Sequence, residues 1–87
     1  MKISVIIPNY NGEKLLEHNL PRICKVLESS GEEIEIIIPD DASKDASLNI
    51  IQAFIKSKKT KLSIRVIKNP RNIGFSSNVN SGVQVAS

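Results

Sequence analysis

The stretch Ile34-Glu35-Ile36-Ile37-Ile38, followed by Pro39-Asp40-Asp41-Ala42-Ser43, decides the fold class of this chain. Its first half is short, mainly aliphatic and β-branched, which is typical of a strand that is covered on both faces in a parallel sheet. Its second half is a turn-forming segment with many hydrogen-bonding side chains. Pro39 lacks a backbone donor, so we expect it to end the strand early. The stretch therefore predicts a buried strand over residues 34–38 that leads into a polar loop.

Two further strands are predicted, over residues 3–7 and at about 62–67, and a helical pattern follows each of the three strands. Consecutive β-α-β units have right-handed crossovers, which place the strands in parallel with the order 3-2-1. The sequence thus predicts an α/β fold with a Rossmann-like parallel sheet in a three-layer α-β-α arrangement. We expect all of residues 1–87 to belong to a single domain.

Capping residues and apolar spacing locate the helices. Asn11 is the expected N-cap of the first helix, and Pro21 should kink or restart that helix. Ser43 is the expected cap of the second helix, and the third should begin near residue 75 or 76. The side chains expected on the inner faces of the first two helices are those of Leu15, Leu16, Leu20, Ile23, Val26, Leu27, Leu48, Ile51, Phe54 and Ile55.

Composition and charge argue against several classes of function. A net charge of +3 is too weak to imply nucleic-acid binding, and an aromatic content of 3% offers no stacking platform for single strands. Cys24 is the only cysteine, so an intramolecular disulfide is impossible and a zinc site is not expected. We find no signal-peptide pattern and no apolar run of about 18 residues. These features predict a cytoplasmic protein that at most rests on the inner face of a membrane.

Ligands of open parallel sheets bind outside the carboxyl ends of the strands. Three predicted loops share that edge, at residues 8–11, 40–43 and 69–74, and none is a dinucleotide fingerprint or a Walker loop. The pair Asp40-Asp41 could serve as turn and capping residues, as part of a metal site, or as an acceptor for the N–H of a uracil or thymine ring. Tyr10 could pack on the surface or stack on a base. Local sequence leaves these alternatives open.

The third loop continues into a polar series of small residues. The series could simply form a turn and the start of a helix, or it could let the backbone approach a ligand and offer amide hydrogen bonds to it. Its members are Asn72, Gly74, Asn78, Asn80 and Gly82.

Taken in order, the three loops resemble the motifs of family 2 glycosyltransferases. Residues 4–11 (SVIIPNYN) resemble the opening of that family, and residues 40–45 (DDASKD) resemble its D-D-x-S-x-D motif. Residues 72–75 (NIGF) and 80–82 (NSG) resemble its N-x-G-F motif and the N-x-G that follows. The resemblance covers essentially the whole chain, and the three motifs in order, each after a predicted strand, are a strong signal. It implies a partial GT-A domain that binds the donor of an inverting glycosyltransferase.

The resemblance also implies roles for individual residues. Pro8 and Tyr10 would line the base pocket, with Tyr10 against the ring face. Asp41 would accept the imide N–H of the base, and Asp40 would support the loop or the ribose. Asn80 would lie at the floor of the sugar-nucleotide cleft. The complete predicted site comprises Pro8, Tyr10, Asn11, Asp40, Asp41, Ser43, Asn72, Gly74 and Asn80, without a catalytic residue or a metal ligand.

The expected partners follow from the same resemblance. Phe75 after Gly74 is similar to rhamnosyltransferase-like members, which favours a UDP- or dTDP-sugar donor, and the acceptor would be a glycan or a lipid-linked molecule. The family holds a divalent metal, Mg²⁺ or Mn²⁺, at a D-x-D motif that would lie beyond Ser87, and its catalytic base would lie further on. We therefore expect these 87 residues to bind no metal and to transfer no sugar by themselves.

Two alternative functions remain open. The chain could be a non-catalytic nucleotide-binding or interaction module with the same half-fold, or a Rossmann-like nucleotide binder of unrelated chemistry.

The strand over residues 3–7 would form an edge of the sheet, and it has no Lys or Pro inside it to discourage pairing. We expect this edge to self-associate or to be covered by the carboxyl-terminal segment.

Overall fold

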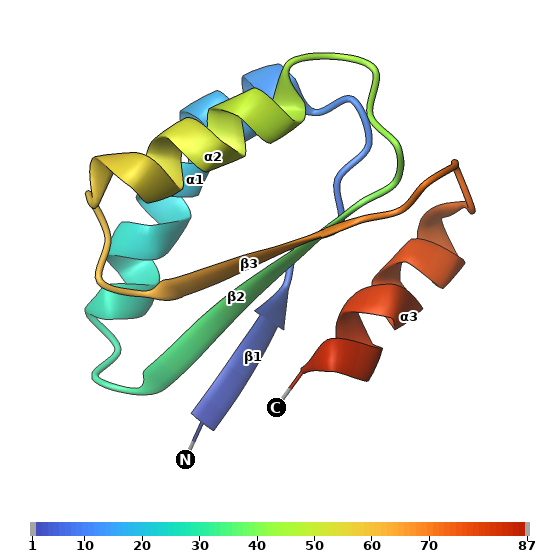
Figure 1. The fold of residues 1–87 in the computed structure, drawn as a ribbon. Coiled ribbons are helices and arrows are strands. Elements are labelled where there is room, and N and C mark those ends of the chain that lie inside the picture. Colours follow the sequence, from blue (N-terminus) through green and yellow to red (C-terminus); the bar gives the residue numbers. More distant parts are fainter. Residues whose placement is uncertain (1, 87) are drawn as a thin grey trace.

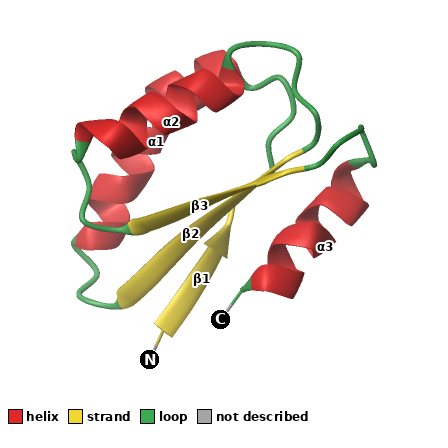
Figure 2. Cartoon of the chain, in the orientation of Figure 1, coloured by secondary structure: helices red, strands yellow, loops and turns green. Residues whose placement is uncertain are grey.

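The computed structural model describes residues 2–86 and has the predicted topology (Figure 1). Its elements are β1 (Lys2–Ile6), α1 (Glu13–Glu28), β2 (Glu33–Asp40), α2 (Ser47–Ser57), β3 (Ser63–Lys68) and α3 (Phe75–Val85). β2 lies between β1 and β3 and pairs in parallel with both, so the predicted order 3-2-1 is confirmed. Helices α1 and α2 cover one face of the sheet and α3 lies on the other, which gives the predicted three layers (Figure 2).

The main core lies between the sheet and helices α1 and α2. Ile34, Ile36 and Ile38 alternate along β2 and join one buried cluster with the inner side chains of the two helices, Leu16, Leu20, Cys24 and Ile51. Cys24 is buried, and burial raises the pKa of its thiol. A buried thiol with a raised pKa is a poor nucleophile, so Cys24 contributes packing rather than chemistry.

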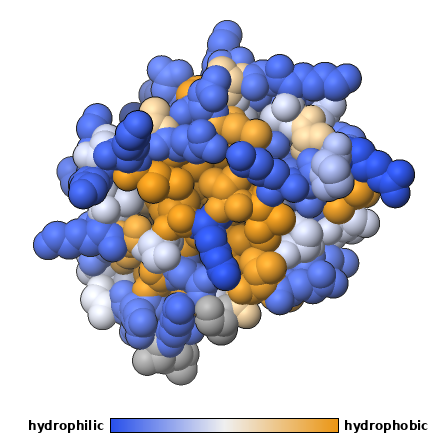
Figure 3. Space-filling model, in the orientation of Figure 1, coloured by the Kyte–Doolittle hydropathy of each residue, from blue (hydrophilic) through white to orange (hydrophobic). Residues whose placement is uncertain are grey.

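Helix α3 packs on the opposite face of the sheet, across β1 and β2. A Cβ atom added at Gly82 would stand 2.9 Å from Cγ2 of Ile6 and 3.2 Å from Cγ of Pro39, so this close approach requires glycine. Arg65 of β3 donates from Nη1 to the carbonyl of Val85 at 2.9 Å. Apolar side chains gather over the strands between α2 and α3 (Figure 3). This packing places the first turn of α3 at the carboxyl edge of the sheet.

β2 continues through Pro39 to Asp40, so the prediction that Pro39 ends the strand early is wrong. The carbonyl of Pro39 accepts the N–H of Asn9, on the β1 side of the strand. The donor that Pro39 lacks would face the same side, where β1 has already ended. Pairing with β3 is therefore unaffected, and the carbonyl of Asp40 accepts the N–H of Asn69 at 2.9 Å.

Neither predicted N-cap is confirmed. α1 begins after Gly12 and α2 after Ala46, and neither cap residue makes a side-chain capping bond. The side chains of Asn11 and Ser43 instead bond to each other's loops. Asn11 donates its N–H to Oγ of Ser43 at 2.9 Å, and Oδ1 of Asn11 accepts the N–H of Lys44 at 2.7 Å. These long-range bonds compete with local capping, and they cannot be derived from the sequence around either residue.

α1 is a single helix that includes Pro21, so Pro21 does not restart it. Pro21 is at an exposed position, where water can satisfy the carbonyl that loses its partner. Leu15 and Val26 were predicted to face the core, but they are 69% and 68% exposed. Both lie roughly 80–100° around the helix from the buried stripe that contains Leu16. In α2, Ile55 is likewise exposed.

The free edge of β1 is not covered by the segment expected to cover it. In the described range, the carboxyl-terminal segment forms α3 and lies across a face of the sheet rather than pairing with that edge. Self-association through β1 stays a prediction.

None of the helices within residues 2–86 combines the length and the apolar character needed to cross a membrane.

Candidate functional site

The three polar loops that follow the strands lie side by side at the carboxyl edge of the sheet. Asn9 forms an isolated parallel bridge with Asp40, and the N–H of Asp41 donates to the carbonyl of Asn9 at 2.9 Å. On the other side, the amide of Asn69 contacts the carboxylate of Asp41. The sequence predicted this juxtaposition, because parallel strands end at the same edge.

A pocket of about 300 Å³ lies between these loops and the first turn of α3. Such a volume is at the lower end of the range for small-molecule sites. The pocket is lined by Pro8, Asn9, Tyr10, Asp41, Asn72, Gly74, Phe75 and Asn78. Five of these residues belong to the predicted site, namely Pro8, Tyr10, Asp41, Asn72 and Gly74. Tyr10 is 50% exposed, so its ring is available to a ligand.

The Asp41 carboxylate holds the third loop in place by hydrogen bonds. Oδ1 accepts the N–H of Ile73 at 2.8 Å and the Asn69 amide at 3.2 Å, and Oδ2 accepts the N–H of Gly74 at 2.9 Å. A carboxylate offers about four acceptor positions, so about one is unused here, and the residue borders the pocket with 3% of its surface exposed. Burial works to raise the pKa of Asp41, but the two N–H groups and the amide outweigh it and hold the pKa below its ordinary value of 3.8.

These contacts should make folding stability fall in acid. A carboxyl whose pKa is lower in the folded chain contributes stability that is fully present above its ordinary, unfolded pKa and is lost as the pH falls through the folded pKa. We expect the urea midpoint to hold down to about pH 5 and to fall below about pH 4. Asp41→Asn should lose less stability in acid than the unmodified chain, whereas Glu17→Gln, at an exposed position, should behave like the unmodified chain. Equal acid sensitivity in Asp41→Asn and the unmodified chain would contradict this role.

Asp40 was predicted to support the loop or a ribose, and its side chain is buried between the loop after β1 and the loop after β2. Only 1% of its surface is exposed. Oδ1 accepts bonds from the Asn9 amide at 2.8 Å and from the Ser43 hydroxyl at 2.6 Å, while Oδ2 accepts the N–H of Ser43 at 3.0 Å. Asp40 and Ser43 therefore join the first two loops and do not line the pocket.

Asn78, on α3, connects the helix to the strand end. Its Nδ2 donates to the carbonyl of Pro39 at 2.8 Å, and its Oδ1 accepts Nδ2 of Asn69 at 2.7 Å. The side chain is buried and borders the pocket. Asn80, the predicted floor residue, is exposed on the same helix and is not among the residues that line this pocket. The sequence motifs contain Asn9 and Phe75, but they gave no signal that either side chain borders the pocket.

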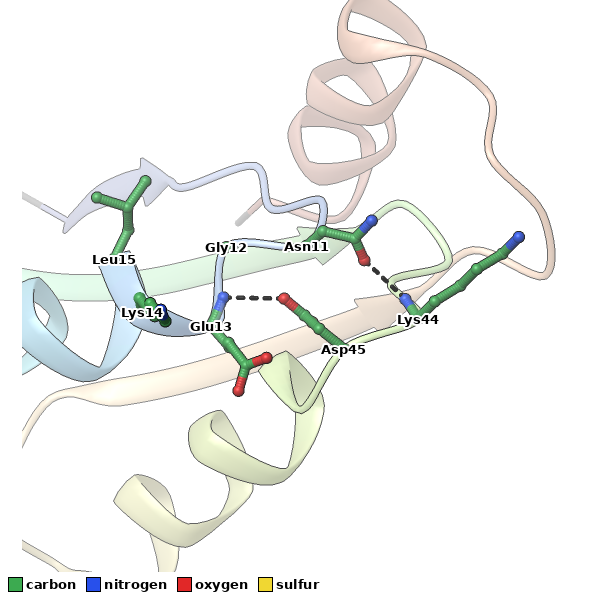
Figure 4. Close-up of a pocket in the computed structure, with 7 residues that line it drawn as sticks. All are labelled: Asn11, Gly12, Glu13, Lys14, Leu15, Lys44 and Asp45. Atoms are coloured by element: carbon green, nitrogen blue, oxygen red, sulfur yellow. Dashed lines mark hydrogen bonds between the residues drawn. The ribbon is translucent and has the colours of Figure 1, made fainter.

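A larger hollow of about 490 Å³ lies beside the start of α1, and it includes the predicted residue Asn11 (Figure 4). Two hydrogen bonds connect its residues: Oδ1 of Asn11 accepts the N–H of Lys44, and Oδ2 of Asp45 accepts the N–H of Glu13 at 3.1 Å. The long side chain of Lys44 points away from this junction (Figure 4). The hollow therefore lies at the junction of two loops.

The carboxylates at the sheet edge do not fit a divalent metal. Within residues 2–86, no three His, Cys, Asp or Glu side chains gather in one place. Asp40 bonds to Asn9 and Ser43, and Asp41 bonds to donors on the third loop, so the two carboxylates serve different partners. A hard divalent cation needs several oxygen ligands around one point, which this arrangement does not provide.

The chain is similar to known proteins along nearly its whole length. Residues 4–87 match the model of glycosyl transferase family 2. The chain is 37% identical over its full length to a dolichol-phosphate mannosyltransferase from Pyrococcus furiosus, and it covers 23% of that protein. It is 34% identical over 74 residues to poly(ribitol-phosphate) β-N-acetylglucosaminyltransferase TarS of Staphylococcus aureus. The aligned segment covers 85% of this chain and 12% of TarS.

Two solved structures have the same fold. Mannosyltransferase PcManGT from Pyrobaculum calidifontis, in complex with GDP-Man and Mn²⁺, superposes with a TM-score of 0.84 at 22% identity over 98% of this chain and 24% of that one. S. aureus TarS 1–349 superposes with a TM-score of 0.78 at 29% identity over 100% of this chain and 25% of that one. The first curated relatives are much longer proteins, of which this chain spans no more than 26%. The match to the family model over nearly all of its length shows that the chain belongs to glycosyl transferase family 2.

Proposed function

We propose that the pocket binds the base of a nucleotide diphospho-sugar, and that residues 1–87 form the donor-binding, amino-terminal part of a GT-A domain in an inverting glycosyltransferase. The observation that carries the proposal is the meeting of Tyr10 and Asp41 at one pocket. A half-exposed tyrosine ring offers a stacking face for a base. The remaining acceptor position of Asp41 suits a ring N–H.

A pyrimidine with an imide N–H, as in a UDP- or dTDP-sugar, fits this pair of groups best. The names of the relatives support an acceptor that is a polymer or is linked to a lipid, and a lipid-linked acceptor would bring the protein to a membrane surface. The described residues supply neither a metal site nor a free carboxylate near the pocket that could deprotonate an acceptor hydroxyl. We therefore assign donor binding to these residues. In a complete enzyme, other residues would hold the Mg²⁺ or Mn²⁺ ion and carry out the transfer step.

The imide contact predicts that UDP binds more tightly than CDP. Uracil presents an N–H at ring position 3, whereas cytosine presents a lone pair there that the Asp41 carboxylate would repel. A hydrogen bond to a charged group is strong enough for a preference of about tenfold or more. Asp41→Asn should reduce or reverse the preference, because an amide can donate to cytosine, and Glu17→Gln should leave it unchanged. NMR titrations of the three chains with both nucleotides measure this, and equal affinities in the unmodified chain would refute the imide contact.

A further inference from the structure

Phe75 has an exposure that the fold does not explain. It is the first residue of α3, and 74% of its surface is open to solvent. The other phenylalanine, Phe54, packs against the main core. Exposed apolar residues are common singly, but Phe75 borders the same pocket as Tyr10. Two of the three aromatic residues of the chain therefore border one small pocket.

The backbone before Phe75 is held in a defined position. Gly74 has φ 89° and ψ 162°, a conformation that residues other than glycine rarely adopt. Its N–H donates to Oδ2 of Asp41 at 2.9 Å and to Oδ1 of Asn72 at 3.1 Å. Three residues after Phe75, Asn78 ties the helix to the carbonyl of Pro39. Phe75 is thus anchored on both sides, although its own ring is not packed in the core.

We propose that Phe75 is a second aromatic wall of the pocket, so that the base of the bound nucleotide lies against Phe75 as well as against Tyr10. The inference rests on the proposed function and extends it, because it makes the first turn of α3 part of base recognition. Tyr10 comes from the loop after β1 and Phe75 from the first turn of α3, so a base between them would connect segments that follow the two outer strands of the sheet. The Asp41 carboxylate would stay at the edge of the ring, and stacking would add affinity without dependence on hydrogen bonds.

The aromatic ring signals in the NMR spectrum test this directly. The chain has one tyrosine, two phenylalanines and no tryptophan, so each ring can be followed separately. We expect UDP to shift the ring protons of Tyr10 and Phe75 and to leave those of Phe54 unchanged. Ribose 5-phosphate, which has no base, should shift neither ring.

Substitutions give the second readout. Phe75→Ala should weaken UDP binding by at least about fivefold, and Phe75→Leu, which keeps apolar volume without an aromatic face, should fall between. Val83→Ala, at another exposed apolar position of α3, should bind UDP like the unmodified chain. Because Phe75 is exposed, these variants should fold, and their amide spectra check this.

The outcomes separate the two proposals. UDP binding that shifts Tyr10 but not Phe75, or that survives Phe75→Ala unchanged, would overturn the second wall and leave the proposed function standing. A Phe75→Ala variant that alters only the self-association of the chain would also overturn it, since the ring would then serve a protein contact. If UDP shifts neither ring in the unmodified chain, both proposals are wrong.

Discussion

Ile36→Ala is expected to lower the free energy of unfolding by about 2–5 kcal/mol, the largest effect of any single substitution that we propose. Ile36 lies in the middle of the central strand and is 0% exposed. Its side chain joins the cluster in which α1 and α2 pack on the sheet. Truncation removes apolar contacts and leaves a cavity that paired strands on both sides cannot close. Domains of this size have only about 5–15 kcal/mol of stability in total, so much of it would be lost.

Urea unfolding followed by circular dichroism measures this effect, and the slope of the transition should stay the same. Ile55→Ala is the matched control, because it removes the same atoms from an isoleucine at an exposed position of α2. We expect the control to lose less than about 1 kcal/mol. Similar losses at both positions would mean that the two helices do not pack on the Ile34, Ile36 and Ile38 face of the sheet.

Asp40→Ala is expected to cost about 2–4 kcal/mol, although Asp40 does not line the pocket. Its carboxylate accepts three hydrogen bonds, from the Asn9 amide and from the N–H and hydroxyl of Ser43. Removal leaves the buried Asn9 amide without its closest acceptor and the N–H of Ser43 without a partner. The Asn9 amide keeps only its longer bond to Oγ of Ser43 at 3.2 Å, and a polar group left without a partner away from water costs about 1–3 kcal/mol.

The same unfolding experiment, with amide exchange at residues 9 and 43, tests the role of Asp40. Ser43→Ala should cost less, because Asn9 keeps its bond to Oδ1 of Asp40 at 2.8 Å. Glu17→Ala removes an exposed carboxylate from α1 and should be nearly neutral. If Asp40→Ala is as stable as Glu17→Ala, the buried junction between the first two loops does not exist as described.

The strand pattern could be predicted because each strand is a short, mainly β-branched run bounded by turn residues, and because short crossovers admit few topologies. The meeting of the three loops follows from that topology alone. The caps could not be predicted, because Ser43 bonds to Asn11 across 32 residues of sequence instead of to its own helix. The effect of Pro39 on the length of β2 could not be predicted, because the effect of its missing N–H donor depends on where β1 ends.

The pocket could be predicted only in part. Pro8, Tyr10, Asp41, Asn72 and Gly74 meet as the motifs indicated. The rotation of α3 decides which helix side chains reach the pocket, and that rotation depends on the packing of Gly82 against Ile6 and Pro39. For this reason Phe75 and Asn78 border the pocket and Asn80 does not, a distinction that no local pattern in the sequence contains.

The central claim is that the pocket between the three loops binds the base of a pyrimidine nucleotide. The most direct measurement is a ¹H–¹⁵N NMR titration of the chain with UDP, with ADP as the comparison. Without a metal to hold the diphosphate, we expect weak binding in about the millimolar range, or roughly 4 kcal/mol. UDP should shift the amides of Tyr10, Asp41 and residues 72–78 most, and ADP should leave them nearly unchanged. Equal shifts with ADP, or shifts confined to the exposed lysines of residues 56–61, would contradict the claim.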